Sequence, residues 1–97
     1  MAAYVIFNYL QVFDEEKILD YRRQAHPTVG KYGGRVNVGP GEMLVLEGPA
    51  SCFMIIAEFA DVASARAWYE SPEYQAARAI REQAAEVQVS IVPVRDR

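Results

Sequence analysis

The sequence contains a single cysteine, Cys52, and a single histidine, His26. One cysteine cannot form an internal disulfide, which agrees with a reducing cytoplasm. One histidine and one cysteine are too few nitrogen and sulfur ligands for a structural zinc site, and an iron–sulfur cluster needs about four thiolates. We therefore expect no metal, no bound cofactor and a cytoplasmic location.

Long apolar runs and clustered positive charges are also missing. No run approaches the roughly 20 apolar residues of a membrane-spanning helix, and the amino terminus shows no basic region followed by a cleavage site, so we expect no signal peptide. The net charge is -3, so a nucleic-acid backbone would find little positive charge to bind. We expect neither a membrane span nor a nucleic-acid partner.

Apolar residues, in contrast, are abundant. They make up 52% of the 97 residues, slightly above the ordinary ~45–50%. This length suits one domain, which we expect to span residues 1–97. Because a small domain has little interior, the surplus of apolar residues indicates a buried interface.

The spacing of these residues predicts the order strand, helix, strand, strand, helix, strand. Alternation predicts strands at Ala3–Val12, at Arg35–Val38 continued by Met43–Glu47, at Ser51–Phe59 and at Glu86–Val94. Recurrence every three or four residues predicts helices at Asp14–Tyr32 and Asp61–Ala85. This order is that of an α+β, ferredoxin-like βαββαβ fold, with a four-stranded antiparallel sheet in the order 4-1-3-2 and helices on one face.

Proline and glycine mark breaks within these segments. Pro27 cannot continue the hydrogen bonds of a helix, so we expect a kink or two short helices there. Ser71 and Pro72 should restart the second helix as cap and first residue. Gly39-Pro40-Gly41 should divide the second strand into two pieces.

Each of the other three strands offers one apolar set of residues and one mixed set. Val5, Phe7 and Tyr9 form such an apolar set, which we assign to the helix side. The mixed sets should face the open side, where polar residues accompany apolar ones such as Ile6 and Ile56. Exposure of so many apolar side chains to water is unfavourable. We therefore expect a homodimer formed through the open sheet face.

Several segments resemble a known family. They are Tyr32-Gly33-Gly34-Arg35, Leu46-Glu47-Gly48, Glu58-Phe59, and Ala67-Trp68-Tyr69 followed by Ser71-Pro72-Glu73-Tyr74-Gln75. Their order and spacing resemble the domain-of-unknown-function family DUF1330, a branch of the dimeric alpha-beta barrel superfamily. The resemblance implies a ferredoxin-like fold that dimerises sheet to sheet, but no established activity. Other branches include cofactor-free monooxygenases, lactone isomerases and haem enzymes, and such a link through the fold alone does not define a function.

Three residues are candidates for proton transfer. His26 is the side chain that most naturally serves as a base near neutral pH, although polar residues are also common at a helix break. Glu58 on the mixed face could be a base in an apolar pocket or simply a salt-bridge partner of Arg35. Glu47 allows the same two interpretations.

Aromatic residues are candidates for binding a ligand. Tyr21, Tyr32, Trp68 and Tyr74 recur on the two helices, where such residues usually belong to the core, but buried hydroxyls also require hydrogen-bond partners. Their convergence with Arg35 would suit an oxygenated organic ligand, and Asn8 on the mixed face could contribute. Arg81 is expected on an exposed helix surface, and Cys52 as an inert, half-buried thiol.

Two functional hypotheses follow from the sequence. The protein could bind a small oxygenated or aromatic organic compound, with or without catalysis. Alternatively, it could be a non-catalytic dimerisation or interaction module in which the same residues only fix the geometry of an interface. No motif in the sequence identifies a reaction.

Overall fold

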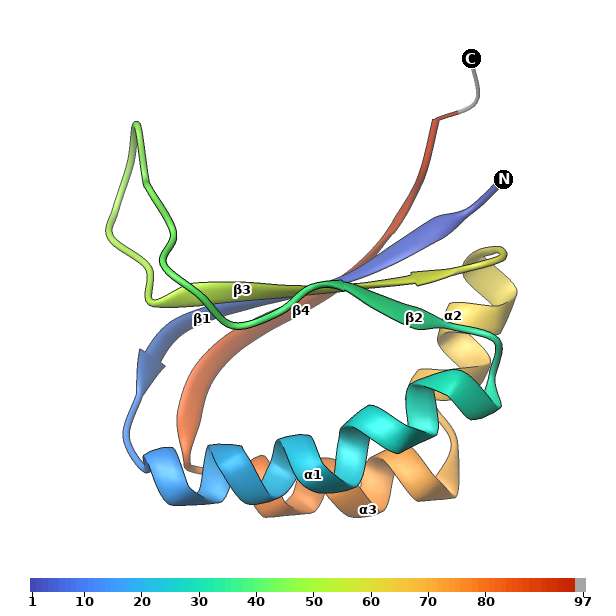
Figure 1. The fold of residues 1–97 in the computed structure, drawn as a ribbon, viewed down its shortest axis with the longest axis horizontal. Helices are drawn as coiled ribbons and strands as arrows, with labels where there is room; N and C mark the ends of the chain where they lie inside the picture. The colour runs from blue at the N-terminus through green and yellow to red at the C-terminus, as the bar shows by residue number, and fades with distance from the viewer. Residues whose placement is uncertain (96–97) are drawn as a thin grey trace.

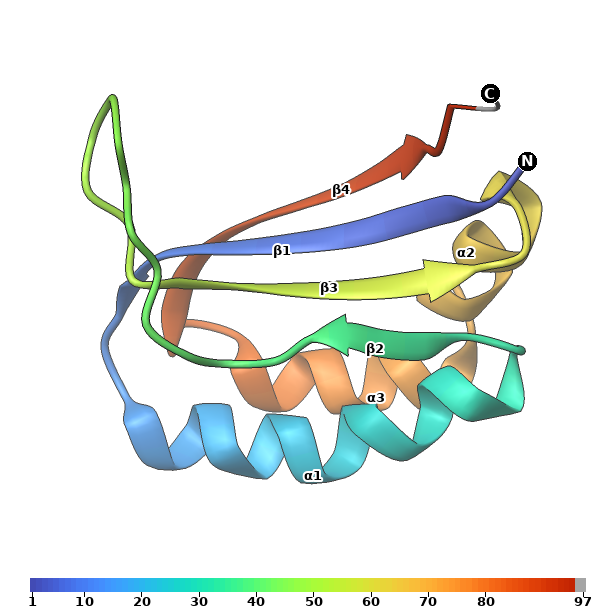
Figure 2. The same ribbon diagram turned by 45° about the horizontal axis from the view of Figure 1, so that its top comes forward.

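The structure is a four-stranded antiparallel sheet with its helices on one side (Figure 1). The computed structural model describes residues 1–95. Its elements are β1 (Ala3–Val12), α1 (Glu15–Lys31), β2 (Arg35–Val38), β3 (Phe53–Phe59), α2 (Val62–Tyr69), α3 (Pro72–Arg81) and β4 (Ala85–Pro93). The order β2-β3-β1-β4, visible in Figure 2, confirms the predicted order read from the other edge.

Each helix begins at a side chain that caps it. The cap accepts a hydrogen bond from a backbone N–H three residues later, which satisfies a group that the first turn leaves unpaired. The pairs are Asp14 with Lys17 at 3.1 Å, Asp61 with Ser64 at 2.7 Å and Ser71 with Tyr74 at 3.2 Å. The predicted restart at Ser71 is confirmed, but α3 ends at Arg81 rather than continuing to Ala85, and Gln83 has a φ of 64° in the turn that follows.

Pro27 does not divide α1 into two helices, so of the two predicted outcomes only a bend within one helix remains. The helix continues to Lys31, and Figure 1 shows its second half inclined toward the sheet. Proline leaves the carbonyl four residues earlier, at Arg23, without its helical donor. Both Pro27 and Arg23 are exposed, so water can replace the missing hydrogen bond.

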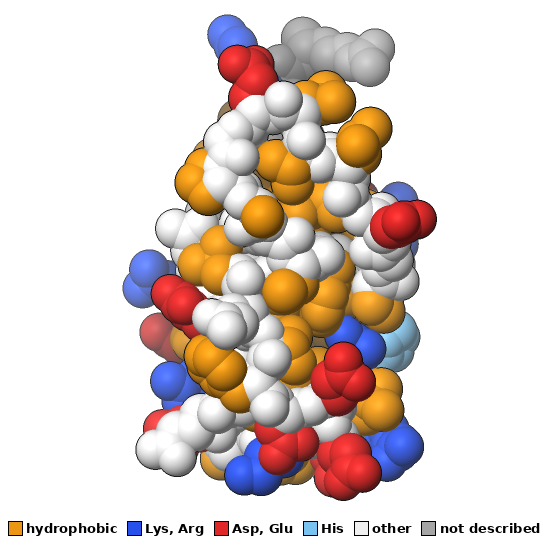
Figure 3. Space-filling view, turned by 90° about the vertical axis from the view of Figure 1, so that its left-hand side faces the viewer, with side chains coloured by type: hydrophobic (Ala, Val, Ile, Leu, Met, Phe, Trp, Pro, Cys, Tyr) orange, Lys and Arg blue, Asp and Glu red, His pale blue; other side chains and the backbone are white. Residues whose placement is uncertain are grey.

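The predicted strand piece Met43–Glu47 is not formed. Residues 39–52 are instead a long loop that stands off the sheet on the side away from the helices (Figure 1). The chain offers this segment no neighbouring strand, and Leu44 and Leu46 are 84% and 85% exposed. Figure 3 shows hydrophobic side chains scattered over the part of the surface that the loop forms, whereas charged side chains are densest over the helices.

The two faces of the sheet differ as predicted. Val5, Phe7 and Tyr9 are buried beneath the helices. No helix of the described residues covers the second face, which we call the open face (Figures 1 and 2). It carries Tyr4, Ile6, Asn8, Met54, Ile56, Glu58, Ser90 and Val92, all half-buried. Ile6 of β1 lies between Ile56 of β3 and Ser90 of β4, so this face mixes apolar and polar side chains.

The turn between α1 and β2 depends on two glycines. Gly33 has a φ of 77°, a conformation that ordinary residues rarely adopt. Gly34 packs against Phe59 so closely that a Cβ atom there would lie 2.5 Å from the ring. These glycines therefore end α1 and allow β2 to reach the edge of the sheet beside β3.

Candidate functional site

A cavity of about 130 Å³ lies between α1 and the sheet. Its inner wall is apolar and comes from β1, β3 and α2, while the exposed residues His26, Gly39 and Pro40 border it toward solvent. The lining contains no aspartate or glutamate. The residues are Phe7, Tyr9, Tyr21, Arg22, Ala25, His26, Val29, Val36, Gly39, Pro40, Ile55, Ala57 and Trp68.

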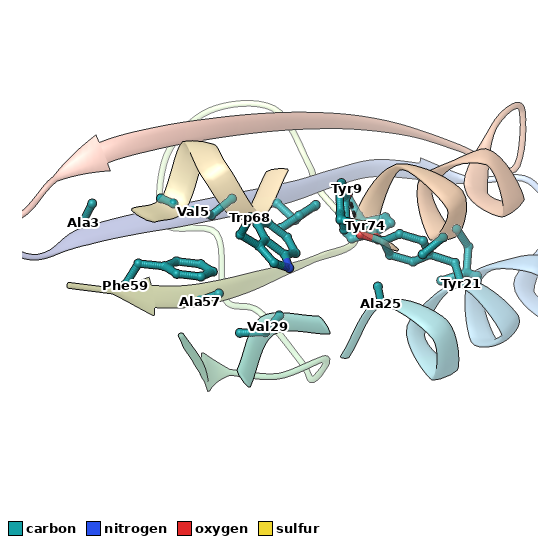
Figure 4. Close-up of a cluster of buried hydrophobic side chains, with 14 of the residues drawn as sticks. Ala3, Val5, Tyr9, Tyr21, Ala25, Val29, Ala57, Phe59, Trp68 and Tyr74 are labelled. Atoms are coloured by element: carbon teal, nitrogen blue, oxygen red, sulfur yellow. Dashed lines mark hydrogen bonds between the residues drawn. The ribbon is translucent and has the colours of Figure 1, made fainter. Parts of the chain in front are cut away.

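Trp68 of α2 is the central aromatic residue of the core. It is 1% exposed, and its ring centroid lies 4.2 Å from that of Tyr74 and 5.4 Å from that of Phe59. Figure 4 shows these rings together between the helices and the sheet. The Trp68 Nε1–H donates a hydrogen bond to Thr28 Oγ1 at 2.9 Å, which satisfies the one polar group of a buried indole.

Tyr21 and Tyr74 form a buried pair whose hydroxyl oxygens are 2.9 Å apart (Figure 4). Burial, reinforced for Tyr21 by the neighbouring Tyr74, raises the pKa of both phenols above their usual value. Arg81 donates from Nη2 to the Tyr74 hydroxyl at 3.4 Å, and its guanidinium carbon lies 5.1 Å from the centroid of the Tyr21 ring. The expectation of an exposed Arg81 was wrong, because the side chain folds inward over these rings and is 8% exposed.

Tyr9 and Arg22 line the cavity beside this pair. Tyr9 is 1% exposed and stacks on Phe53 with ring centroids 4.4 Å apart. Burial raises the pKa of Tyr9 to about 12. The guanidinium carbon of Arg22 lies 5.0 Å from the centroid of the Phe53 ring, and its Nε is buried without a hydrogen-bond partner in the described part of the chain.

A second polar group lies on the open face. Glu58 accepts a hydrogen bond from Asn37 Nδ2 at 2.6 Å and lies 3.5 Å from Arg35 Nη2. Asn8 accepts a hydrogen bond from Ser51 Oγ at 2.5 Å, which ties the end of the loop to β1. The sheet therefore separates Arg35, Glu58 and Asn8 from the buried tyrosines, and the predicted convergence of Arg35 with those hydroxyls does not occur within one chain.

The remaining candidates lie at the periphery. His26 is exposed at the border of the cavity, and Glu47 is exposed in the loop formed by residues 39–52. The hydroxyl of Tyr32 donates toward both carboxylate oxygens of Glu73 at 3.4 Å, near the end of α1. Cys52 is exposed rather than half-buried.

The cavity lining includes the predicted ligand residues Tyr21 and Trp68 and the predicted base His26, but not the predicted ligand residues Tyr74 and Tyr32. It also includes Arg22 and Tyr9, which the sequence did not indicate. Tyr9 was assigned only to the apolar set of β1, and its position there was the available signal. Arg22 directly follows Tyr21 on α1, but this helix contains four lysine or arginine residues. Nothing in the spacing shows which of them turns toward the sheet.

Comparisons with known proteins agree on the fold. A family model described as Domain of unknown function (DUF1330) matches residues 2–94, and no curated protein matches the chain. A protein of unknown function from Rhodopseudomonas palustris is 22% identical, with a TM-score of 0.77 over 99% of this chain and 84% of that one.

Two further solved structures share the arrangement. One is a dimeric ferredoxin-like protein of unknown function from Jannaschia sp. CCS1, at 13% identity and a TM-score of 0.76, over 97% of this chain and 100% of that one. The other is SnoaB, a cofactor-independent oxygenase from Streptomyces nogalater, at 8% identity and a TM-score of 0.66, over 99% of this chain and 95% of that one. Identities this low show a common ferredoxin-like fold and nothing further.

Proposed function

The chain belongs to the DUF1330 family of domains of unknown function, and from this premise we propose that it is a homodimeric protein that binds a small aromatic or oxygenated organic compound. The observation that carries the proposal is the apolar cavity between α1 and the sheet. Ligand sites are typically concave, mostly apolar and supplied with a few polar groups that orient the ligand. Tyr9, Tyr21 and Arg22 are those groups here.

The size of the cavity favours a ligand with a single ring. An apolar cavity of roughly 150 Å³ accommodates benzene, and the volume here is about 130 Å³. Phe7 and Trp68 offer ring edges and faces against which an aromatic ligand can pack. A larger compound would have to project past His26 into solvent.

Any catalysis in this cavity would use the side chains of the chain itself. His26 is the predicted proton-transfer residue that borders the cavity, so it is our candidate base. Glu58 lies on the open face together with the predicted ligand residues Arg35 and Asn8. Glu47 lies in the loop. These residues could meet a ligand only at the seam of a dimer.

The open face is the proposed dimer interface. Leaving Ile6, Met54 and Ile56 in contact with water costs free energy that a second copy would remove. The loop formed by residues 39–52, which contains the exposed Leu44 and Leu46, stands on the same side of the sheet (Figure 1) and would extend the contact. The Jannaschia relative is described as dimeric. The exposed thiol of Cys52 would suit a reducing compartment such as the cytoplasm.

The alternative, a dimerisation module without a ligand, has one observation in its favour. Asn37, Arg35 and Glu58 form a polar cluster at the β2 edge of the open face. Such a cluster can fix the geometry of two copies. In that case Arg35→Ala should weaken the dimer and leave the binding of every small molecule unchanged.

A thermal-shift screen of small aromatic acids, amides and lactones tests the proposal. A compound that binds only the folded state stabilises it and so raises the melting temperature. The stabilisation is about 2.7 kcal/mol when the compound is at about a hundred times its Kd. We expect single-ring compounds to give the largest shifts and two-ring compounds smaller ones. The proposal fails if no compound of either size changes the melting temperature.

A further inference from the structure

Among the polar side chains that line the cavity, Arg22 and Tyr9 can donate hydrogen bonds, and Arg22 is a cation. Arg22 is positively charged at any physiological pH and can only donate. It has no salt-bridge partner within residues 1–95, and its Nε is buried and unpaired. Tyr9, whose hydroxyl can donate as well as accept, lines the same cavity.

The direction of the buried hydrogen bonds adds a third donor. Arg81 must donate to the Tyr74 oxygen, since a guanidinium has no acceptor. Tyr74 is 0% exposed and does not line the cavity, so its own proton is best satisfied by donation to Tyr21 Oη at 2.9 Å. The Tyr21 proton is then left without an acceptor in this pair, at a residue that lines the cavity.

These donors have no anionic counterpart in the wall of the cavity, because its lining contains no aspartate or glutamate. An occupant that supplies only apolar surface would leave the donors unpaired, at a cost. A carboxylate accepts hydrogen bonds at both oxygens and pairs with arginine in a charge-assisted, bidentate way.

We infer that the cavity takes a small carboxylic acid with a single apolar ring, whose carboxylate binds Arg22 and the Tyr21 hydroxyl while the ring packs against Phe7 and Trp68. This inference rests on the proposed function and adds the charge of the ligand. It gives Arg22 the role that the sequence suggested for Arg35, whose side chain is 75% exposed on the other side of the sheet.

The test compares benzoate with benzamide, which has nearly the same shape but no charge. Both are titrated into the full chain at neutral pH and moderate salt, and binding is followed by the fluorescence of Trp68, which lines the cavity and is the only tryptophan. We expect benzoate to bind at least about tenfold more tightly than benzamide. A hydrogen bond to a charged group contributes about 1.5–3 kcal/mol, and a tenfold change in Kd corresponds to about 1.4 kcal/mol.

Two variants and one matched control locate the charge effect. Arg22→Met keeps an apolar side chain of similar length but removes the cation, and it should abolish the preference for benzoate. Arg23→Met removes the adjacent cation, which is 73% exposed and paired with Asp20, and should preserve the preference. Tyr21→Phe, which removes only the hydroxyl, should weaken benzoate severalfold more than benzamide. If circular dichroism shows that Arg22→Met is unfolded, Tyr21→Phe is the decisive variant.

The outcomes separate this inference from the proposed function. Equal affinities for benzoate and benzamide would overturn the inference while leaving a ligand cavity in place. Loss of the preference in Arg23→Met to the same extent as in Arg22→Met would also overturn it. Absence of binding by benzoate, benzamide and toluene alike would reject both the inference and the cavity as a ligand site.

Discussion

Filling the cavity with a larger side chain should stabilise the protein and remove ligand binding. Ala25 on α1 is 6% exposed and lines the cavity, so Ala25→Leu would place its added carbons there. The cavity of about 130 Å³ borders solvent at His26, so the roughly 24 cal/mol per Å³ known for closed cavities is an upper bound on the cost of leaving it unfilled. Leucine adds three carbons, which recover at most about 2 kcal/mol at roughly 0.8 kcal/mol each.

Urea unfolding followed by Trp68 fluorescence measures this change. We expect the free energy of unfolding of Ala25→Leu to rise by about 1–2 kcal/mol, with no thermal shift on adding benzamide. Ala76→Leu makes the same substitution at an exposed position of α3 and should stay within about 0.5 kcal/mol of the parent. All samples need equal protein concentration, because the stability of a dimer depends on it.

Two results would refute the reasoning. A loss of more than about 1 kcal/mol in Ala25→Leu would mean that the space is already filled and the new side chain overpacks it. A gain in stability with unchanged binding of benzamide would mean that the ligand binds elsewhere.

Three other changes test the core, the interface and the titration of the buried phenols. Thr28→Val removes the acceptor of the Trp68 indole at 2.9 Å and should cost about 1–3 kcal/mol in urea unfolding; Thr28→Ser should restore most of it, and equal losses would contradict the assigned hydrogen bond. Ile56→Lys in the middle of the open face should give a monomer by light scattering at micromolar concentration, and a persistent dimer would place the interface elsewhere. The folded state holds the pKa of Tyr9 at about 12 instead of 10.0. The contribution of this pKa shift to the free energy of unfolding is therefore complete below about pH 10. It is lost, by on the order of 2–3 kcal/mol, as the pH rises toward about 12. Tyr9→Phe should show a weaker decline over that range, and identical profiles would exclude this source.

The fold could be predicted from the sequence because its signals are local and agree with one another. Alternation in β1 separated Val5 and Phe7 from Ile6, and the structure places them on opposite faces. Asp14 and Ser71 marked the starts of helices, since a cap acts on the next turn alone. The chain order then left a single common topology for four such strands.

The errors concern interactions that local patterns do not contain. A strand needs a neighbour, and Met43–Glu47 has the composition of a strand but no partner in this chain. Pro27 is tolerated inside α1 because it faces water. The burial of Arg81 depends on the Tyr21 ring, which lies on another helix, and helical periodicity cannot predict such a contact between elements.

The sequence predicted a set of proton-transfer residues and a set of ligand-binding residues, and each set combines residues that the structure places on opposite sides of the sheet. The sequence brought Tyr21, Trp68 and Arg35 together by their chemistry, whereas the sheet places Arg35 on the opposite side from the other two. The position of Arg22 requires the packing of α1 on β3, where its guanidinium lies over Phe53. A polar residue on a helix reveals its role only once the surface beneath it is known.

The most direct test of the account is to locate a bound ring relative to Trp68 by nuclear magnetic resonance. In a sample saturated with benzoate, we expect nuclear Overhauser contacts from the ring protons to the Trp68 indole and to Ile55, both of which line the cavity. The same contacts should vanish in Ala25→Leu. Contacts to Ile6 and Ile56 of the open face, with none to Trp68, would contradict the assignment of the cavity as the ligand site.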